Sequence, residues 1–295
     1  MYTPAAFGGG SVQVFMLNYC LGINTGINVL IIDCSLPQQI VASVQIGYHI
    51  YLQDFAMSEI LVIRHGQGSF GQGDYDNLSE KGYKQSQLLA EYLYNYRYKN
   101  KKIDALYCGT LKRQQQTADS IIKYFELKGV QLPVPKIDRR LNEYDSINII
   151  KTIFPVLLND EPSLEDEIKQ IYTDKKAFQR VFEKVMRYWV KSPMHYEGIE
   201  SFSEVKQRVK SVITEIIQEQ GRGKNIIVVS SGGIIGTIVQ MVLGFDDETA
   251  MRLTWQIVNT SMTHLRYNEK ELILASFNFF PHIELANDPS MKTYR

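Results

Sequence analysis

The sequence predicts an α/β fold, a three-layer α/β/α sandwich with a mostly parallel sheet and a helical cap insertion. Two short apolar runs, 60–63 and 226–229, have the composition of strands that are buried on both faces of a parallel sheet. Stretches with apolar residues at helical spacing separate the predicted strands, as in folds with helices on both faces of a sheet. Polar residues follow both runs directly, at the edge where such sheets bind ligands.

The composition is that of an ordinary soluble globular protein. Among 295 residues, 32 are Lys or Arg and 32 are Asp or Glu, and 44% are hydrophobic. This neutral balance gives no reason to expect nucleic acid or an anionic membrane as a partner. The three cysteines (Cys20, Cys34 and Cys108) form neither a disulfide framework nor a paired metal spacing. We therefore predict a cytoplasmic protein.

Residues 1–56 differ from the rest of the chain. They contain no Lys or Arg and two acidic residues, Asp33 and Asp54. The apolar stretch 12–32 is interrupted by Asn and Gly, which makes it a weak membrane span, and no basic segment precedes it as in a signal peptide. We predict a non-native or disordered extension over 1–56 and one domain over 57–295. A membrane-associating or pairing segment at 1–56 is the alternative, and no membrane contact is expected for 57–295.

The first buried run ends on Arg64, His65 and Gly66. An imidazole at this edge could act as a nucleophile, a base or a metal ligand. The neighbouring guanidinium offers a planar set of donors that suits a phosphate or a carboxylate. A strand that merely ends in polar residues is the alternative interpretation of these positions.

A polar loop and two helices follow the first strand. Residues 66–76 are rich in Gly, Gln, Asp and Ser, and Ser79 is a candidate helix N-cap. A second strand at 103–108 leads into a helix whose first turn contains Arg113. Backbone N–H groups and a guanidinium at a helix start could both face an anion, although an exposed helix arginine is the simpler interpretation.

A third strand at 134–137 precedes a polar segment that contains Glu143 and Asp145. Residues 146–200 are predicted to form a helical cap over the strand ends that helps to select the substrate. The predicted cap helices are 149–158, 163–172 and 176–190.

The last third of the chain begins with a capping box at Ser201 and an amphipathic helix that ends near Gly221. The second buried run then ends on Ser231, Gly232 and Gly233, and a helix follows. A strand, a glycine turn and a helix N-terminus together form an anion cradle, without the lysine of a Walker motif. Two final strands are predicted at 263–267 and 272–277.

Four segments of this sequence match a family pattern, in the family's order. From Met57 to the C-terminus the chain resembles the histidine phosphatase superfamily, the phosphoglycerate mutase-like proteins; residues 1–56 lie outside the resemblance. The matching segments are Ile63–Gln67, Leu78–Ser86, Gly109–Ala118 and Val228–Gly233.

The resemblance implies a phosphatase that hydrolyses phosphate monoesters through a phosphohistidine on His65, without a cofactor or a metal. Glu143 matches the family's proton donor, and Asp145 is the fallback if the loop aligns two residues further on. The phosphoryl group would be held by Arg64, Arg113, Ser231 and Gly232. The partner would be a small phosphorylated substrate, which the sequence does not name, and the oligomeric state is not predicted.

One residue departs from the family pattern. Ser231 stands where the family usually has a second histidine before the two glycines, so the chain resembles a branch with serine at this position. A serine hydroxyl donates one hydrogen bond but carries no positive charge, a handicap on the order of 3 kcal/mol. A weakened member that binds a phosphorylated ligand or a protein partner is therefore the alternative, and a phosphoglycerate mutase is a less favoured one. His282, after the last strand, could reach back to the strand ends and substitute for the histidine that Ser231 replaces.

Overall fold

The computed structural model describes residues 57–69, 76–162, 164 and 175–294. The prediction for residues 1–56 lies outside these ranges, and so does the predicted helix at 163–172 apart from residue 164. The stretch Met57–Arg295 forms one compact unit. Within the described ranges no helix combines the length and the apolar character that a membrane span requires.

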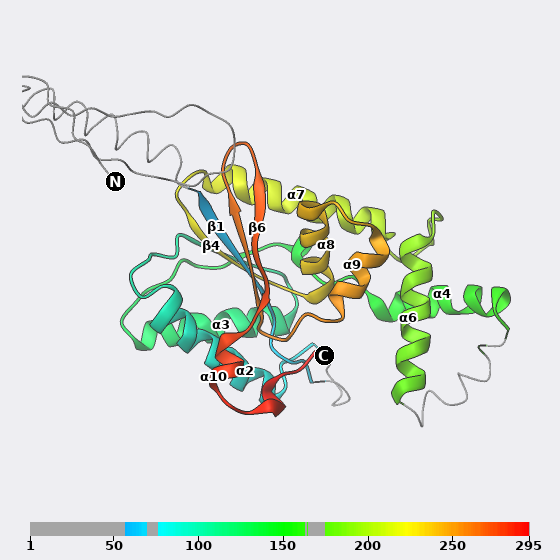
Figure 1. Cartoon of the computed structure of the whole chain (residues 1–295), viewed down its shortest axis with the longest axis horizontal. Coiled ribbons are helices and arrows are strands. Elements are labelled where there is room, and N and C mark those ends of the chain that lie inside the picture. Colours follow the sequence, from blue (N-terminus) through cyan, green and yellow to red (C-terminus); the bar gives the residue numbers. More distant parts are fainter. Residues whose placement is uncertain (1–56, 70–75, 163, 165–174, 295) are drawn as a thin grey trace, which may run out of the picture. The chain divides into compact units, whose positions relative to one another are not determined.

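A six-stranded mixed sheet forms the centre of this unit (Figure 1). The strand order is β3-β2-β4-β1-β5-β6, with parallel pairing throughout β3-β2-β4-β1 and antiparallel pairing of β5 with both β1 and β6. The predicted α/β class is confirmed. The strands are β1 (Ser58–Arg64), β2 (Ala105–Cys108), β3 (Lys136–Ile137), β4 (Asn225–Ser230), β5 (Met262–Tyr267) and β6 (Leu272–Phe279).

The helices begin close to the residues that the sequence indicates. Ser79 caps α2 by accepting a hydrogen bond from the Gly82 N–H, and Ser201 forms the expected capping box with Glu204 at the start of α7. The α-helices are α2 (Glu80–Tyr92), α3 (Lys112–Leu127), α4 (Ser146–Asp160), α6 (Lys175–Lys191), α7 (Phe202–Gln220), α8 (Gly232–Leu243), α9 (Asp247–Thr254) and α10 (Pro281–Leu285).

Alternating side chains of β1 face two different hydrophobic clusters. Leu61 and Ile63 pack with residues of α2 and α3, whereas Ile60 and Val62 pack with residues of α7 and α8. The second cluster extends into α4, α6 and α9, so the insertion shares the main core. Both faces of β1 are therefore covered, which explains its continuous apolar run.

Two details differ from the sequence prediction. The third strand has two residues, Lys136–Ile137, in place of the four predicted, and both are exposed at the sheet edge. Helices α9 and α10 were not predicted, because each is short and gives a weak periodic signal. The Asp246 side chain caps α9 by accepting from the Thr249 N–H, and this start signal was in the sequence.

Candidate active site

His65 follows the last residue of β1 and is buried. Its Nδ1 lies 2.7 Å from the Gly66 carbonyl oxygen, and its Nε2 lies 3.1 Å from the Nε of Arg113. A carbonyl oxygen only accepts and a guanidinium N–H only donates, so the hydrogen is assigned to Nδ1 and the lone pair to Nε2. The contacts thus select one neutral tautomer, with Nε2 as the nucleophilic atom.

The surroundings of His65 disfavour its charged form. Burial, followed by the positive charges of Arg113 and Arg64, holds its pKa well below the usual value, against an opposing effect of the Gly66 carbonyl. The imidazole is therefore neutral near pH 7. A neutral imidazole is the form that can attack phosphorus.

The two predicted arginines both lie at this strand end. Arg64 is buried, and its Nη1 donates to the carbonyl of Ile257. Arg113 lies in the first turn of α3 and is 7% exposed, so it is not the surface arginine of the simpler interpretation. Its Nη1 donates to Asp76 Oδ1 at 2.8 Å, while its Nε donates to His65. Two fixed positive charges therefore lie beside His65.

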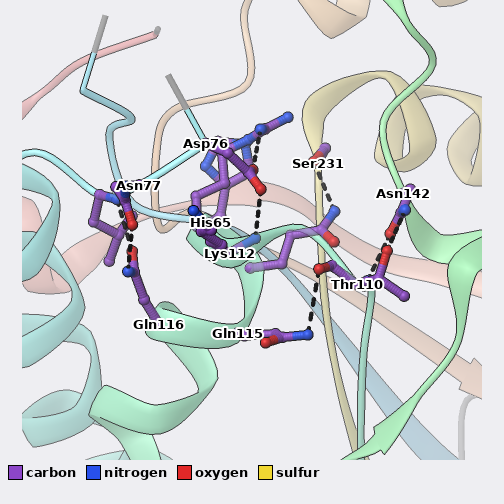
Figure 2. Close-up of polar contacts among 12 residues, drawn as sticks. His65, Asp76, Asn77, Thr110, Lys112, Gln115, Gln116, Asn142 and Ser231 are labelled. Carbon is purple, nitrogen blue, oxygen red and sulfur yellow. Dashed lines mark hydrogen bonds and ion pairs between the residues drawn. The ribbon is translucent and has the colours of Figure 1, made fainter. Parts of the chain in front are cut away.

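Asp76 was not predicted, and Figure 2 shows its carboxylate against the start of α3. Its Oδ2 accepts from the Lys112 backbone N–H at 2.9 Å, and its Oδ1 accepts from Arg113. The anion position expected at this helix start thus holds a carboxylate of the chain itself. Asp76 closes a loop rich in polar residues, and nothing in its local pattern distinguishes it from its neighbours.

Ser231 lies at the end of β4, beside β1 in the sheet. Residue Arg64 pairs with Ser230, and the His65 N–H donates to the Ser230 carbonyl, so His65 and Ser231 leave the sheet side by side. Ser231 Oγ accepts from the Gln114 Nε2 at 2.8 Å, a contact drawn in Figure 2. The same Nε2 donates to the Leu141 carbonyl at 3.1 Å, which fixes the orientation of the amide.

The hydroxyl of Ser231 makes this single hydrogen bond within the described part of the chain, and it makes it as an acceptor. Its own hydrogen is therefore available for another acceptor. Gln114 is fully buried between these groups and was not recognised in the sequence. It follows Arg113 directly, and its amide has no feature that a sequence pattern could separate from its two neighbouring glutamines.

Glu143 lies at the N-terminus of α8, where its Oε2 accepts from the Gly233 N–H at 3.0 Å. A Cβ atom on Gly233 would lie 2.3 Å from Glu143 Oε1 and 2.2 Å from Tyr144 Cε1, so this position requires glycine. Asp145, the fallback, instead caps α4 by accepting from the Asn148 N–H at 3.0 Å, and it is exposed. Of the two carboxylates, Glu143 is the one that contacts the glycine turn.

A pocket of about 440 Å³ lies next to Glu143. Ile149 of α4 and residues 198–200 line it from the insertion, and Arg139 and Arg208 line it from outside the insertion. The insertion therefore contributes to a cavity beside the candidate proton donor. Its predicted role in substrate selection stays a prediction.

The three other histidines in the described part of the chain contact groups other than Ser231. His282 is buried, its Nε2 lies 2.8 Å from Thr260 Oγ1, and burial lowers its pKa to about 3. Thr260 in turn donates its N–H to the carbonyls of Arg64 and His65, so His282 supports the motif through the backbone. His264 lies 3.5 Å from Glu59, and the side chain of His195 is exposed.

The segment 257–261 also holds the motif and was missed, because the sequence signal for β5 starts after it. Asn259 Nδ2 donates to the His65 carbonyl at 3.1 Å, and the Arg64 N–H donates to the Ser261 carbonyl at 3.1 Å. Thr260 has a φ of 60°, which is uncommon for a β-branched residue. Among the residues that the structure describes, no three His, Cys, Asp or Glu side chains gather as in a metal site.

The sequence and the fold match known proteins. The family model of the histidine phosphatase superfamily (branch 1) matches residues 60–149 and 169–279. No curated protein matches the chain.

Three solved structures illustrate the similarity in fold. A phosphoglycerate mutase from Bacillus anthracis is 17% identical with a TM-score of 0.54, over 80% of this chain and 100% of that one. A phosphoserine phosphatase mutant from Entamoeba histolytica is 19% identical with a TM-score of 0.52, over 77% and 100%. A mycobacterial glucosyl-3-phosphoglycerate phosphatase is 19% identical with a TM-score of 0.50, over 76% and 99%. By its sequence match, the chain belongs to the histidine phosphatase superfamily.

Proposed function

We propose that this protein hydrolyses phosphate monoesters through a phosphohistidine on His65. The observation that carries the proposal is the neutral imidazole whose Nε2 faces Arg113, with Arg64 next to it. A nucleophile with an available lone pair and two adjacent guanidinium groups suits a phosphoryl group, which spreads negative charge over its oxygens during transfer.

In the first step, His65 Nε2 forms a bond to phosphorus while the bond from phosphorus to the ester oxygen breaks. Arg113 would move its donors from Asp76 and His65 to the phosphoryl oxygens, and Ser231 and the backbone of Gly232 would donate to the same group. Glu143, in its protonated form, gives its proton to the leaving oxygen. Acid catalysis of this kind is worth roughly a hundred- to ten-thousandfold.

In the second step, water attacks phosphorus and the bond from phosphorus to Nε2 breaks. Glu143, now a carboxylate, takes the proton from the water. Inorganic phosphate leaves, and His65 returns to its neutral state. Water replaces the proton that Glu143 gives up, and the chain's own groups supply each hydrogen-bond donor, so the proposed cycle uses neither a metal nor a cofactor.

A catalytically weakened member that binds a phosphorylated ligand or a protein partner is the second candidate. Ser231 favours it, because the hydroxyl is neutral and is held by Gln114. A phosphoglycerate mutase is less favoured, since Ser231 cannot hold the phosphoryl group as a second histidine would. Isomerisation of phosphoglycerate would identify that third activity.

The experiment is hydrolysis of a generic aryl phosphate by the full chain, with a chelator present. Turnover should be abolished in His65→Ala and retained in His195→Ala, a matched control because the His195 side chain is 72% exposed. Labelled substrate should leave an acid-labile label on the wild-type protein after rapid quenching. A folded wild-type protein that binds phosphate but shows neither turnover nor label would favour the binding function.

A further inference from the structure

The two peptide groups that follow His65 are held at both ends by hydrogen bonds. The His65 carbonyl accepts from Asn259 Nδ2 at 3.1 Å, and the Gly66 N–H donates to Thr117 Oγ1 at 3.0 Å. The Gly66 carbonyl accepts from His65 Nδ1, and the Gln67 N–H donates to Gln85 Oε1 at 2.9 Å. The orientation of the imidazole thus depends on these two peptide planes, because its Nδ1 bonds to one of them.

Two of the side chains that hold these peptides are linked through the C-terminal segment. Thr293 Oγ1 accepts from Gln85 Nε2 at 2.8 Å and donates to Asn259 Oδ1 at 2.9 Å. The Asn259 N–H donates to the Thr293 carbonyl at 2.8 Å, and Gln85 Nε2 also donates to the Met291 carbonyl at 2.7 Å. The segment after α10 is therefore bonded both to α2 and to the turn before β5.

The orientation of both amides in this network is determined by their backbone partners. Asn259 Nδ2 faces a carbonyl oxygen, which only accepts, so its Oδ1 must face Thr293. Gln85 Oε1 faces the Gln67 N–H, which only donates, so its Nε2 must face Thr293. The Thr293 hydroxyl then faces one donor, Gln85 Nε2, and one acceptor, Asn259 Oδ1, and it forms a hydrogen bond with each. A methyl group in its place would leave the buried Asn259 Oδ1 without this donor. Gln85 Nε2 would lose one of its two acceptors and keep the Met291 carbonyl.

We propose that Asn259, Thr293 and Gln85 form a positioning network that fixes the tautomer and direction of His65, so that the C-terminal segment is part of the catalytic apparatus. The network touches the backbone of His65 and Gln67 and does not touch the phosphoryl position. The kinetic part of this inference rests on the proposed function, whereas the tautomer of His65 can be measured without any turnover.

Thr293→Val tests the network, because valine keeps the shape of threonine and removes the hydroxyl. Thr293 is partly exposed near the end of the chain, so the fold should persist. The measurement is the imidazole ¹⁵N shift of His65 in protein labelled on histidine, assigned with His65→Gln. The wild type should show one Nδ1–H tautomer, and Thr293→Val should show an average of two.

The rate of phosphohistidine formation should fall about five- to tenfold in Thr293→Val, as expected for one lost hydrogen bond. Inorganic phosphate should bind within about twofold of the wild type, because the network does not contact it. Thr293→Ser should restore both the tautomer and the rate. Thr214→Val, an exposed threonine of α7, is the matched control and should change neither.

A wild-type tautomer and a wild-type rate in Thr293→Val would overturn the positioning role. Failure of the proposed function gives a different result: no phosphohistidine forms in the wild type, and the tautomer still changes in Thr293→Val. The two readouts therefore separate the network from the chemistry that it is proposed to serve.

Discussion

The two central strands, β1 and β4, run side by side in the same direction and end at the same edge of the sheet, yet their ends are built differently. The end of β1 carries Arg64 and His65, with Arg113 against them. The end of β4 carries Ser231 and two glycines, with Glu143 on the backbone of Gly233. The positive charges and His65 belong to one side, and backbone N–H groups, a neutral hydroxyl and the Glu143 carboxyl group belong to the other.

This difference indicates where a positive charge at the position of Ser231 would matter. A second histidine at Ser231 would place a cation on both sides of the phosphoryl group. In this chain the donors on the β4 side are neutral, and Gln114 fixes the hydroxyl of Ser231. In the proposed reaction the β1 side would therefore supply most of the electrostatic stabilisation, and substitutions on the two sides should have unequal effects.

Arg113→Gln should have the largest effect. It removes a charge next to the phosphoryl position and the N–H that faces His65 Nε2. Loss of one transition-state donor costs about a hundred- to a thousandfold in kcat, and this substitution removes a charge as well. Steady-state kinetics with an aryl phosphate measure the kcat of Arg113→Gln relative to that of the wild type.

Arg113→Lys is the companion variant, since it keeps the charge and loses the planar set of donors. It should recover part of the rate. Equal losses in Arg113→Gln and in Ser231→Ala would contradict the assignment of charge to the β1 side.

His282→Asn should change how stability responds to acid, because the β1 end rests on this buried histidine through Thr260. Burial lowers the pKa of His282 to about 3, so the folded protein keeps it neutral while the unfolded chain, with a pKa of about 6.5, takes up a proton. Stability should therefore fall as the pH drops below about 6.5. Between pH 7 and pH 5 this residue contributes a loss of about 2 kcal/mol.

Urea unfolding of the wild type and of His282→Asn at these two pH values measures the difference between the two losses. Carboxylates with ordinary pKa values stay largely ionised in this window, so the histidines dominate. His195→Asn, a substitution at an exposed residue, should lose as much stability between pH 7 and pH 5 as the wild type does. The same loss in His282→Asn would show that His282 is not held neutral in the fold.

Asp76→Asn should strengthen phosphate binding modestly. The carboxylate occupies the start of α3 and pairs with Arg113, so an incoming phosphate must displace it. An amide keeps the shape and loses the charge, which removes a competitor for Arg113. We expect the Kd for inorganic phosphate to fall about three- to tenfold, as for a partly exposed ion pair of roughly 1 kcal/mol.

Calorimetric titration with phosphate checks this expectation. Weaker binding in Asp76→Asn would mean that the carboxylate orients Arg113 and does not compete with the ligand. Glu80→Gln, which removes an exposed partner of Lys84, controls for the change in net charge.

The β1 end could be predicted from the sequence to a greater extent than the β4 end and the supporting loops. A buried strand that stops on Arg64 and His65 leaves a local signal, and the position of Arg113 follows from the helix start. The predicted residues Arg64, His65 and Ser231 lie at the adjacent ends of β1 and β4. Arg113 contacts His65 from α3, and Glu143 contacts Gly233 from the loop before α4.

The groups that hold those residues left no local signal. Asn259 and Gln85 are bonded to positions 194 and 18 residues away, and their amides resemble any surface amide in the sequence. Asp76 acquires its role only when its loop meets α3. Side-chain bonds to distant backbone groups depend on tertiary packing, which periodicity and capping patterns do not encode.

Ser231→Ala should lower the rate less than Arg113→Gln does, and it is the sharpest test of the comparison. It removes one neutral donor from the β4 side, and a neutral hydrogen bond is worth about 1 kcal/mol, so the rate should fall about fivefold. Ser231→His alone should not restore a charged donor, because Ser231 is fully buried against the Gln114 amide. Ser231→His combined with Gln114→Ala leaves the imidazole ring the space that the Gln114 amide fills. If the double variant hydrolyses an aryl phosphate faster than Ser231→His alone, Gln114 occupies the space that a second histidine needs. If it does not, residues other than Ser231 and Gln114 also prevent a charged donor on the β4 side.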